Sequence, residues 1–224
     1  MEKQAAKEAE PICRAVMLRL LAHAPTQGRA GSDLRTAVGD FLAQLEWYLL
    51  YDEYGPPVKD IFDQARAIGV DLEEFEDVRK VAFNYLPAPK TVGAKLAQNS
   101  LIEFTLVEEA QVIGSTVFTS REDVDAVKKV VNAAFDPMEE LAADDMDQAA
   151  FGALVGLHAA VAFHLATVAR PLPRMLGYAF YNTLSSLVIG YKLYSDAGRF
   201  DEIRAENKII HPAFCPMEGR ALSG

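Results

Sequence analysis

The sequence predicts a mainly α protein, with a helical body of about seven helices followed by a small module of the order strand, helix, helix, strand. Two observations predict the body. Apolar residues recur at helical spacing before Arg174, and no convincing alternating strand pattern interrupts them. A third observation predicts the module: after the Pro171-Leu172-Pro173 break, MLGYAFYN has the short, aromatic character of a strand.

The first two helices are expected on either side of APTQGRAGS. The first keeps Ile12, Ala15, Val16, Arg19, Leu20 and His23 on roughly one face, with Pro11 in its first turn. Ser32 or Asp33 is expected to cap the second, LRTAVGDFLAQLEWYLLYDEY, and Gly55-Pro56-Pro57 is expected to end it. Core packing is our main interpretation of its aromatic cluster, and an exposed assembly surface is the alternative; the cluster consists of Phe41, Trp47, Tyr48, Tyr51 and Tyr54.

Five further helices complete the predicted body. VKDIFDQARAIG closes at Gly69, and Asp71 caps LEEFEDVRKVAFNYL. TVGAKLAQNSLIEFTLVEEAQVIGSTVF is long and apolar. Thr119 or Ser120 caps the next helix, which has acidic residues in its first turn. The last long helix, DQAAFGALVGLHAAVAFHLATVAR, ends at the proline break.

Composition favours a soluble protein that works through partners. The 224 residues are 50% hydrophobic and 24% charged, with a formal net charge of -10. Because neutralising phosphates needs clustered Lys and Arg, we expect no nucleic-acid binding. Residues 168–224 hold seven basic and five acidic residues, a net of +2, so the remainder carries -12. The acidic stretch Asp136 to Asp147 is interpreted as a solvated helix end and loop.

No targeting or membrane segment is expected. Residues 1–10, MEKQAAKEAE, lack the apolar core of a signal peptide. The longest apolar run, Phe151 to Val168, is interrupted by His158 and His164 and is expected to be too polar for a membrane span. We therefore expect a protein made in the cytoplasm, without a membrane partner.

Histidines and cysteines give no metal-binding pattern. His158 and His164 are six residues apart, which places them about 120° from stacking on one helix. We expect both to be satisfied polar positions at a helix interface. Cys13 and Cys215 lie in no Cys/His ligand spacing and are expected to be small core residues, although pairing in an oxidising setting stays open.

Catalytic motifs are also missing. The sequence contains no phosphate-binding glycine loop, nucleophile elbow or H-E-x-x-H pattern. Glu108-Glu109 is the best carboxylate pair, and we interpret it as a helix face that turns to solvent. The prediction is a protein that is not an enzyme and has no metal, cofactor or catalytic residue.

Three segments after about Ala97 and the final stretch carry a family resemblance. SLIEFTLVEEAQVIGSTVFTSRED, DAVKKVVNAAFDPMEE and HLATVARPLPRMLGY come first, and TLSSLVIGYKLYSDAGRFDEIRAENKIIHPAFCPMEGRAL is the most specific. In this order they resemble the C-terminal part of the phage DNA-circularisation proteins, the Mu-type tail and baseplate family. That family's β-rich N-terminal domain has no counterpart here. The resemblance suggests three regions: a weakly matched helical region 1–96, a helical body 97–173 and a C-terminal module 174–224.

The final stretch also resembles a LysM module, which has the same strand, helix, helix, strand order. We expect Leu187 and Tyr191 to share a helix face that Ile203 meets from the next helix. Ser195 replaces a usual glycine, which suits a turn that is not left-handed. Asn207 is expected to close the second helix because Asn tolerates the left-handed conformation. The expected assembly and module residues are Leu187, Tyr191, Tyr194, Asp196, Arg199, Ile203, Asn207, Pro212 and Gly219.

The resemblance implies a structural component of a contractile phage tail baseplate, proximal to the hub or tube or connecting the wedges. Its partners would be tube, hub, sheath or wedge proteins and further copies of itself in a symmetric ring. It would be made in the host cytoplasm and end in the virion tail. The alternatives are a peptidoglycan-binding LysM-type module, in which Tyr191, Tyr194 and Phe200 could line a groove, and a tail assembly factor. A helical enzyme or regulator is a further possibility.

Overall fold

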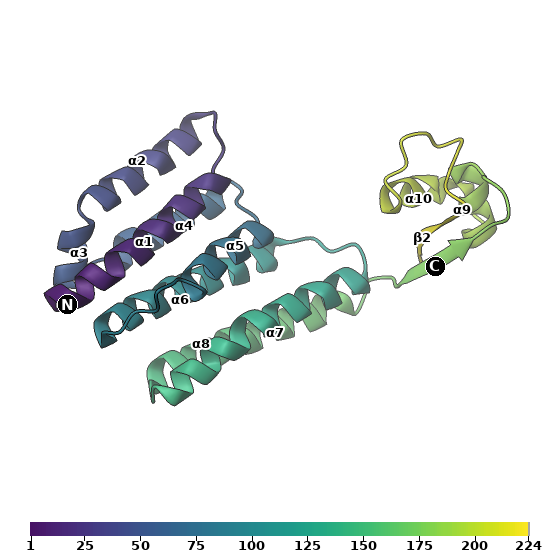
Figure 1. Cartoon of the computed structure of the whole chain (residues 1–224). Coiled ribbons are helices and arrows are strands. Elements are labelled where there is room, and N and C mark those ends of the chain that lie inside the picture. The colour runs from purple at the N-terminus through teal and green to yellow at the C-terminus, as the bar shows by residue number, and fades with distance from the viewer. Residues whose placement is uncertain (224) are drawn as a thin grey trace. The chain divides into compact units, whose positions relative to one another are not determined.

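The computed structural model describes residues 1–223 and is mainly helical with one small sheet, as predicted (Figure 1). Contacts divide the chain into two compact units. Unit 1 contains residues 1–116 and 133–161, and unit 2 contains residues 117–132 and the chain from residue 162 on. The predicted division at residue 96 stays a prediction, and the helix at that point continues across it. Unit 1 contains helices α1 Lys3–His23, α2 Arg29–Ala43, α3 Leu45–Tyr51, α4 Gly55–Ala67, α5 Leu72–Phe83 and α6 Val92–Ser115.

The first helix begins earlier than predicted. Pro11 lies inside α1 and not in its first turn. Because Ala5, Ala6 and Ala9 are buried, the charged N-terminal residues extend the helix across the core. Pro11 itself is exposed.

The second predicted helix is two helices, so residues 1–173 contain eight helices and not seven. The break is at Gln44, whose φ of -110° and ψ of 9° leave the helical region. Ser32 and Asp33 are wrong as caps, because α2 already begins at Arg29 after Gly28, which has a φ of 95°.

Gly55-Pro56-Pro57 does not end a helix, as expected from the prolines, but starts α4. Asp52 ends α3 in the left-handed conformation with a φ of 62°. Prolines then occupy the first positions of α4, where their missing N–H groups cost no helical hydrogen bond.

Three other boundaries are confirmed. Gly69 follows α4 with a φ of 98°. Asp71 forms a capping box with Glu74 at the start of α5. Ser120 accepts a hydrogen bond from the Asp123 N–H (3.2 Å) and donates its own N–H to the Asp123 carboxylate (3.0 Å).

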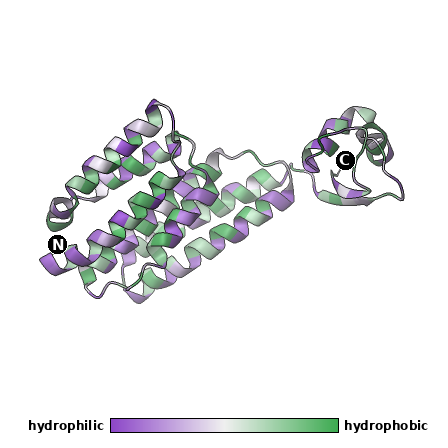
Figure 2. Cartoon of the chain, turned by 45° about the horizontal axis from the view of Figure 1, so that its top comes forward, coloured by the Kyte–Doolittle hydropathy of each residue, from purple (hydrophilic) through white to green (hydrophobic). Residues whose placement is uncertain are grey.

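Helix α6 is the centre of unit 1 and contacts α1, α4 and α5. It buries residues on most sides, including Leu101, Leu106 and Ile113. A helix that is apolar nearly all round must be covered by others. Most helices in Figure 2 carry both green and purple residues, which is the pattern of helices with one buried face and one solvent face.

The long helices α7 Arg121–Asp144 and α8 Gln148–Ala169 follow each other in the chain and have parts in both units. α7 buries one stripe, which consists of Val124, Val131, Ala134, Phe135, Met138 and Ala142. The acidic stretch at its end and the loop that follows are mostly exposed, as predicted.

The proline break after α8 is tied to the start of α7. The Arg121 guanidinium donates to the carbonyl oxygens of Leu172 (2.8 Å) and Arg170 (3.1 Å), and its N–H donates to Pro173. Glu122 accepts the Met175 N–H at 2.7 Å. The first strand is therefore anchored at its beginning.

Residues 174–223 form the βααβ module of the predicted order. Strand β1 Met175–Ala179 pairs antiparallel with β2 Glu218–Leu222, and Gly177 lies opposite Arg220. Between them lie α9 Ser186–Tyr194, the short 3-10 helix η1 Ala197–Arg199 and α10 Phe200–Glu206. The core consists of Tyr178, Ile189, Ile203, Cys215 and Ala221.

The Glu8 carboxylate of α1 binds the two residues that precede α6, accepting the N–H groups of Lys90 and Thr91 at 2.9 Å. Hydrogen bonds from the Gln4 side chain and from the backbone N–H groups of Thr91 and Lys90 lower the pKa of this carboxyl to about 2. Because the folded pKa is lower than the ordinary glutamate pKa of 4.5, the contribution to stability is present above pH 4.5 and is lost as pH falls toward 2.

We therefore expect Glu8→Gln to lower the denaturation midpoint at pH 7, and to lower it less at pH 3. Chemical denaturation followed by circular dichroism measures this difference. Glu10→Gln is the matched control, because Glu10 is on the same helix and forms an exposed ion pair with Arg14. An equal effect of the two substitutions at pH 7 would show that the bonds of Glu8 to Lys90 and Thr91 do not stabilise the fold.

Candidate functional site

The face of α9 that was expected to meet Ile203 points to solvent instead. Leu187 is 51% exposed and Tyr191 is 64% exposed, whereas Ile203 is fully buried. Ile189 is the α9 residue that shares the core with Ile203. The expected contact was wrong because α9 is apolar on both sides, so periodicity alone did not identify its core face.

Tyr194, Asp196 and Arg199 organise the turn between the two helices of the module. The Arg199 guanidinium lies 3.7 Å from the centre of the Tyr194 ring and bonds the Glu202 carboxylate. Asp196 accepts the Gly198 N–H at 2.7 Å. Ser195 has a φ of 57°, so this turn is left-handed after all and contains a residue with a side chain.

Asn207 connects α10 to the outer edge of β2. Its amide nitrogen donates to the carbonyl oxygens of Ile203 (2.8 Å) and Arg220 (2.7 Å), and its oxygen accepts the Arg220 N–H at 2.7 Å. It is the residue that follows α10, as expected, but its φ is -104°, and Lys208 adopts the left-handed conformation instead.

Pro212 and Gly219 close the module. The Pro212 carbonyl accepts the Ser186 N–H at 2.8 Å, which fixes the return loop to the start of α9. Gly219 lies against Tyr178 and Asn207 so closely that no side chain fits there. Of the nine expected residues, Leu187 and Tyr191 present large apolar surface to solvent, and the others mainly hold the module together.

Seven large apolar side chains of the module are at least half exposed to solvent. Large apolar side chains that are scattered singly over a surface are normal, but a dense group on a small unit indicates an interaction site. Those at least 50% exposed are Leu176, Tyr181, Leu187, Tyr191, Ile210, Phe214 and Met217.

The aromatic cluster of the body is only partly core. Phe41 and Tyr54 are buried, as the main interpretation predicts. Trp47 and Tyr51 are 51% and 65% exposed, with ring centroids 5.1 Å apart. This pair fits the alternative, an exposed surface with aromatic anchors.

Helix α8 has the most unusual surface of the chain. It carries no Asp, Glu, Lys or Arg over its 22 residues, yet only 17% of its most apolar window is buried. Leu154, Val161 and Leu165 form its buried stripe, while Phe163 is 73% exposed. By length and composition this one helix could cross a membrane, so the two histidines do not make it too polar.

Small residues line part of the uncovered α8 face. A Cβ atom built on Gly152 or on Gly156 would have no neighbour within 4 Å. Helices α6 and α8 line a groove of about 420 Å³, and its walls include Phe104, Val107 and Leu157. The backbone of α8 is therefore open to close approach by another helix.

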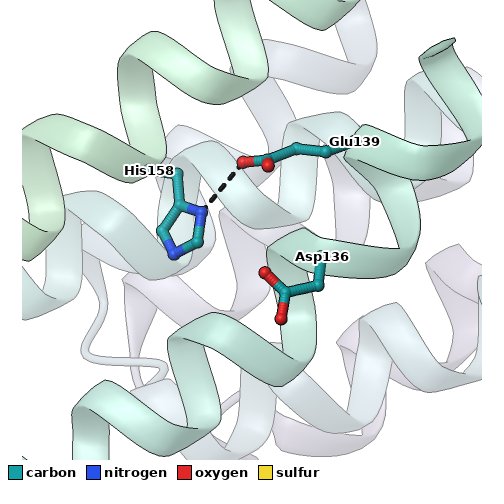
Figure 3. Close-up of side chains that lie close together, drawn as sticks. All are labelled: Asp136, Glu139 and His158. Carbon is teal, nitrogen blue, oxygen red and sulfur yellow. Dashed lines mark hydrogen bonds and ion pairs between the residues drawn. The ribbon is translucent and has the colours of Figure 1, made fainter.

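A mixed cluster of acidic and histidine side chains lies between α7 and α8 in unit 1 (Figure 3). The His158 Nδ1 lies 2.8 Å from a Glu139 carboxylate oxygen, and Asp136 lies beside them. His158 also stacks on Phe135, with centroids 4.9 Å apart. His158 is thus at a helix interface, as predicted. Sequence reasoning compared it only with His164 and missed its partners on the preceding helix.

Glu108 and Glu109 were expected on a solvent-facing side of their helix, but this prediction is wrong. Both residues are only 2% exposed. Arg66 of α4 bonds Glu108 (2.7 Å), and Arg79 of α5 bonds Glu109 (2.8 Å). Burial raises the pKa of Glu108, and it raises the pKa of Glu109 to about 6. These pairs join three helices.

Both cysteines are free, buried thiols, as the core interpretation predicts. Cys13 belongs to α1, where burial raises the pKa of its thiol to about 12. Cys215 belongs to the module core. A thiol that stays protonated is a poor nucleophile, so Cys13 is suited to packing.

Comparison with known proteins gives no further identification. No protein-family model matches this sequence. No curated protein matches it either.

Proposed function

We propose that this chain is a structural component of a contractile phage tail baseplate, which acts through protein-protein assembly. The uncovered apolar face of α8 is the observation that favours an assembly role most. The resemblance of residues 97–224 to the Mu-type tail and baseplate family supports the choice of particle.

Charge distribution supports docking through α8. Two copies of a chain with a net charge of -10 repel each other over most of their surfaces. α8 contributes no charged side chain, so a neighbour can cover it without desolvating an ion. Burying Phe163 contributes about 1.5–3 kcal/mol, which makes it a suitable anchor.

The occupant that we assign to this face is a helix of a tail protein or of a further copy in a ring. Gly152 and Gly156 leave room for such a helix to approach closely. The proposal includes the tube, hub, sheath or wedge proteins as neighbours and the virion tail as the final location.

The proposal is tested with Phe163→Glu in the gene of the producing phage. We expect the variant chain to fold normally, because Phe163 is exposed, but to be lost from purified tails by at least about tenfold. Quantitative mass spectrometry of isolated tails against the hub protein measures this. Ala126→Glu is the matched control, since it adds the same charge at an exposed position of α7.

Three outcomes are informative. A fixed ratio of the native chain to the hub protein, lost only with Phe163→Glu, supports the proposal. Equal incorporation of both variants would show that α8 is not a docking face. A native chain that is absent from tails and sediments with membranes would make α8 a membrane helix and overturn the baseplate role.

A glycan-binding module is the second candidate, and the exposure of Tyr191 favours it. An exposed aromatic ring is a common platform for a sugar ring, and Tyr191 is 64% exposed. Tyr194, by contrast, is covered by Arg199. Retention of the full chain on insoluble peptidoglycan, lost with Tyr191→Ala, would favour this candidate.

A further inference from the structure

We propose that Asp136, Glu139 and His158 form a binding site for Zn²⁺. Each residue offers one ligand atom, and these atoms all lie within 4.8 Å of one another. The two carboxylates are one turn apart on α7, and the imidazole reaches them from α8 (Figure 3).

The distances suit a small cation. Zn²⁺ takes imidazole nitrogen and carboxylate oxygen at about 2.0–2.2 Å, so ligands of a tetrahedral site lie about 3.3 Å apart. The Nδ1 to Oε1 distance of 2.8 Å has to open slightly, and the Asp136 oxygen has to approach. Asp136 is exposed, so its side chain can rotate, and water can complete the coordination.

The charge of the cluster also fits a cation. The two ionised carboxylates contribute a charge of -2, and the structure of residues 1–223 shows no Lys or Arg paired with either of them. A similar group elsewhere is different: His23 lies beside Asp77 and Glu74, but Arg19 already bonds the Asp77 carboxylate. That group therefore already contains a positively charged side chain, Arg19. Among residues 1–223, no Lys or Arg pairs with the carboxylates of Asp136 and Glu139.

The imidazole is held in place before any ion binds. Its ring stacks on Phe135 at an interplanar angle of 18°, and the side chain is 18% exposed. Fixed ligands lower the entropic cost of binding. A bound ion would join α7 to α8 directly.

The ligand set selects the class of metal. Magnesium and calcium prefer oxygen ligands alone, whereas a nitrogen with two carboxylate oxygens suits zinc and its neighbours in the first transition row. Co²⁺ is the practical substitute, because its visible absorption reports the number and geometry of ligands.

The test is a calorimetric titration of the full-length protein with Zn²⁺, together with Co²⁺ absorption. We expect one site whose affinity falls at least about tenfold in Asp136→Asn and in His158→Gln. Glu140→Gln and His23→Gln are the matched controls: the first removes a neighbouring exposed carboxylate, and the second removes the other histidine-carboxylate group.

Asp136→Asn decides the test, because an exposed residue is replaced and folding is preserved; circular dichroism checks this for both variants. Binding that is equal in the native chain, Asp136→Asn and His158→Gln would overturn the proposal. So would loss of binding only in His23→Gln, or a native protein that leaves the Co²⁺ spectrum unchanged.

Discussion

Replacing Arg79 by Met is expected to destabilise unit 1 by about 3–5 kcal/mol at pH 8, because it leaves a buried carboxylate without its partner. Glu109 is 2% exposed, and the Arg79 side chain is 9% exposed. The Arg79 Nε donates to Glu109 at 2.8 Å. Removing the guanidinium therefore removes both a hydrogen bond and the only ion pair of this carboxylate among residues 1–223.

The size of this effect should depend on pH. Burial raises the folded pKa of Glu109 to about 6, above the ordinary glutamate pKa of 4.5. As pH rises past 4.5 the unfolded chain loses its proton first, so the contribution of this group is most favourable below 4.5 and falls as pH rises to about 6. Without Arg79 the folded pKa rises further. The loss of stability in Arg79→Met should therefore be smaller at pH 5 than at pH 8.

Urea denaturation at the two pH values measures both effects. Replacing Glu109 by Met as well should recover most of the stability, because an apolar pair of similar volume needs no desolvation of charge. Lys80→Met is the control, since Lys80 forms an exposed pair with Glu76 and should cost less than about 1 kcal/mol. A loss in Arg79→Met below that of the control, or one that does not change with pH, would contradict this account.

Gly219→Ala is expected to destabilise the βααβ module by about 1–3 kcal/mol or more, because the added methyl group has no space. A Cβ at this position would lie 2.5 Å from the Tyr178 hydroxyl oxygen and closer still to the Asn207 amide oxygen. Moving either group disturbs the core or the contact of α10 with β2. Both lie between secondary-structure elements, so the strain is not easily relieved.

Hydrogen exchange of peptides from residues 175–222 measures this effect, because the single Trp lies in unit 1 and does not report on the module. Gly177→Ala is the matched control on the opposite strand: its Cβ would have Gly219 O as nearest neighbour at 4.0 Å. Faster exchange in Gly219→Ala alone is the expected result. Equal exchange in both variants would show that residue 219 tolerates a side chain.

Sequence reasoning identified features that are set by a few adjacent residues. The Asp71 capping box, the left-handed Gly69 and the Ser120 cap each depend on a short motif. The Gly55-Pro56-Pro57 signal failed because proline both ends a preceding helix and suits the first turn of the next. Local sequence could not decide between the two.

The candidate site could be predicted only in part, because its main features depend on distant residues. The sequence predicts that Glu108 and Glu109 face solvent, because their partners are distant. Arg66 of α4 is 42 residues from Glu108, and Arg79 of α5 is 30 residues from Glu109. The Asp136 cluster needs a helix hairpin that brings together residues 19 positions apart. Leu187 and Tyr191 were selected correctly as a pair on one face, but which face α9 buries depends on the fold of the whole module.

The amide of Asn207 occupies the N–H and the C=O of Arg220, the positions that a third strand would use. Growth of the sheet beyond β2 is therefore blocked by one side chain. Copies of the module therefore cannot pair with one another through that edge, which protects the protein against fibre formation.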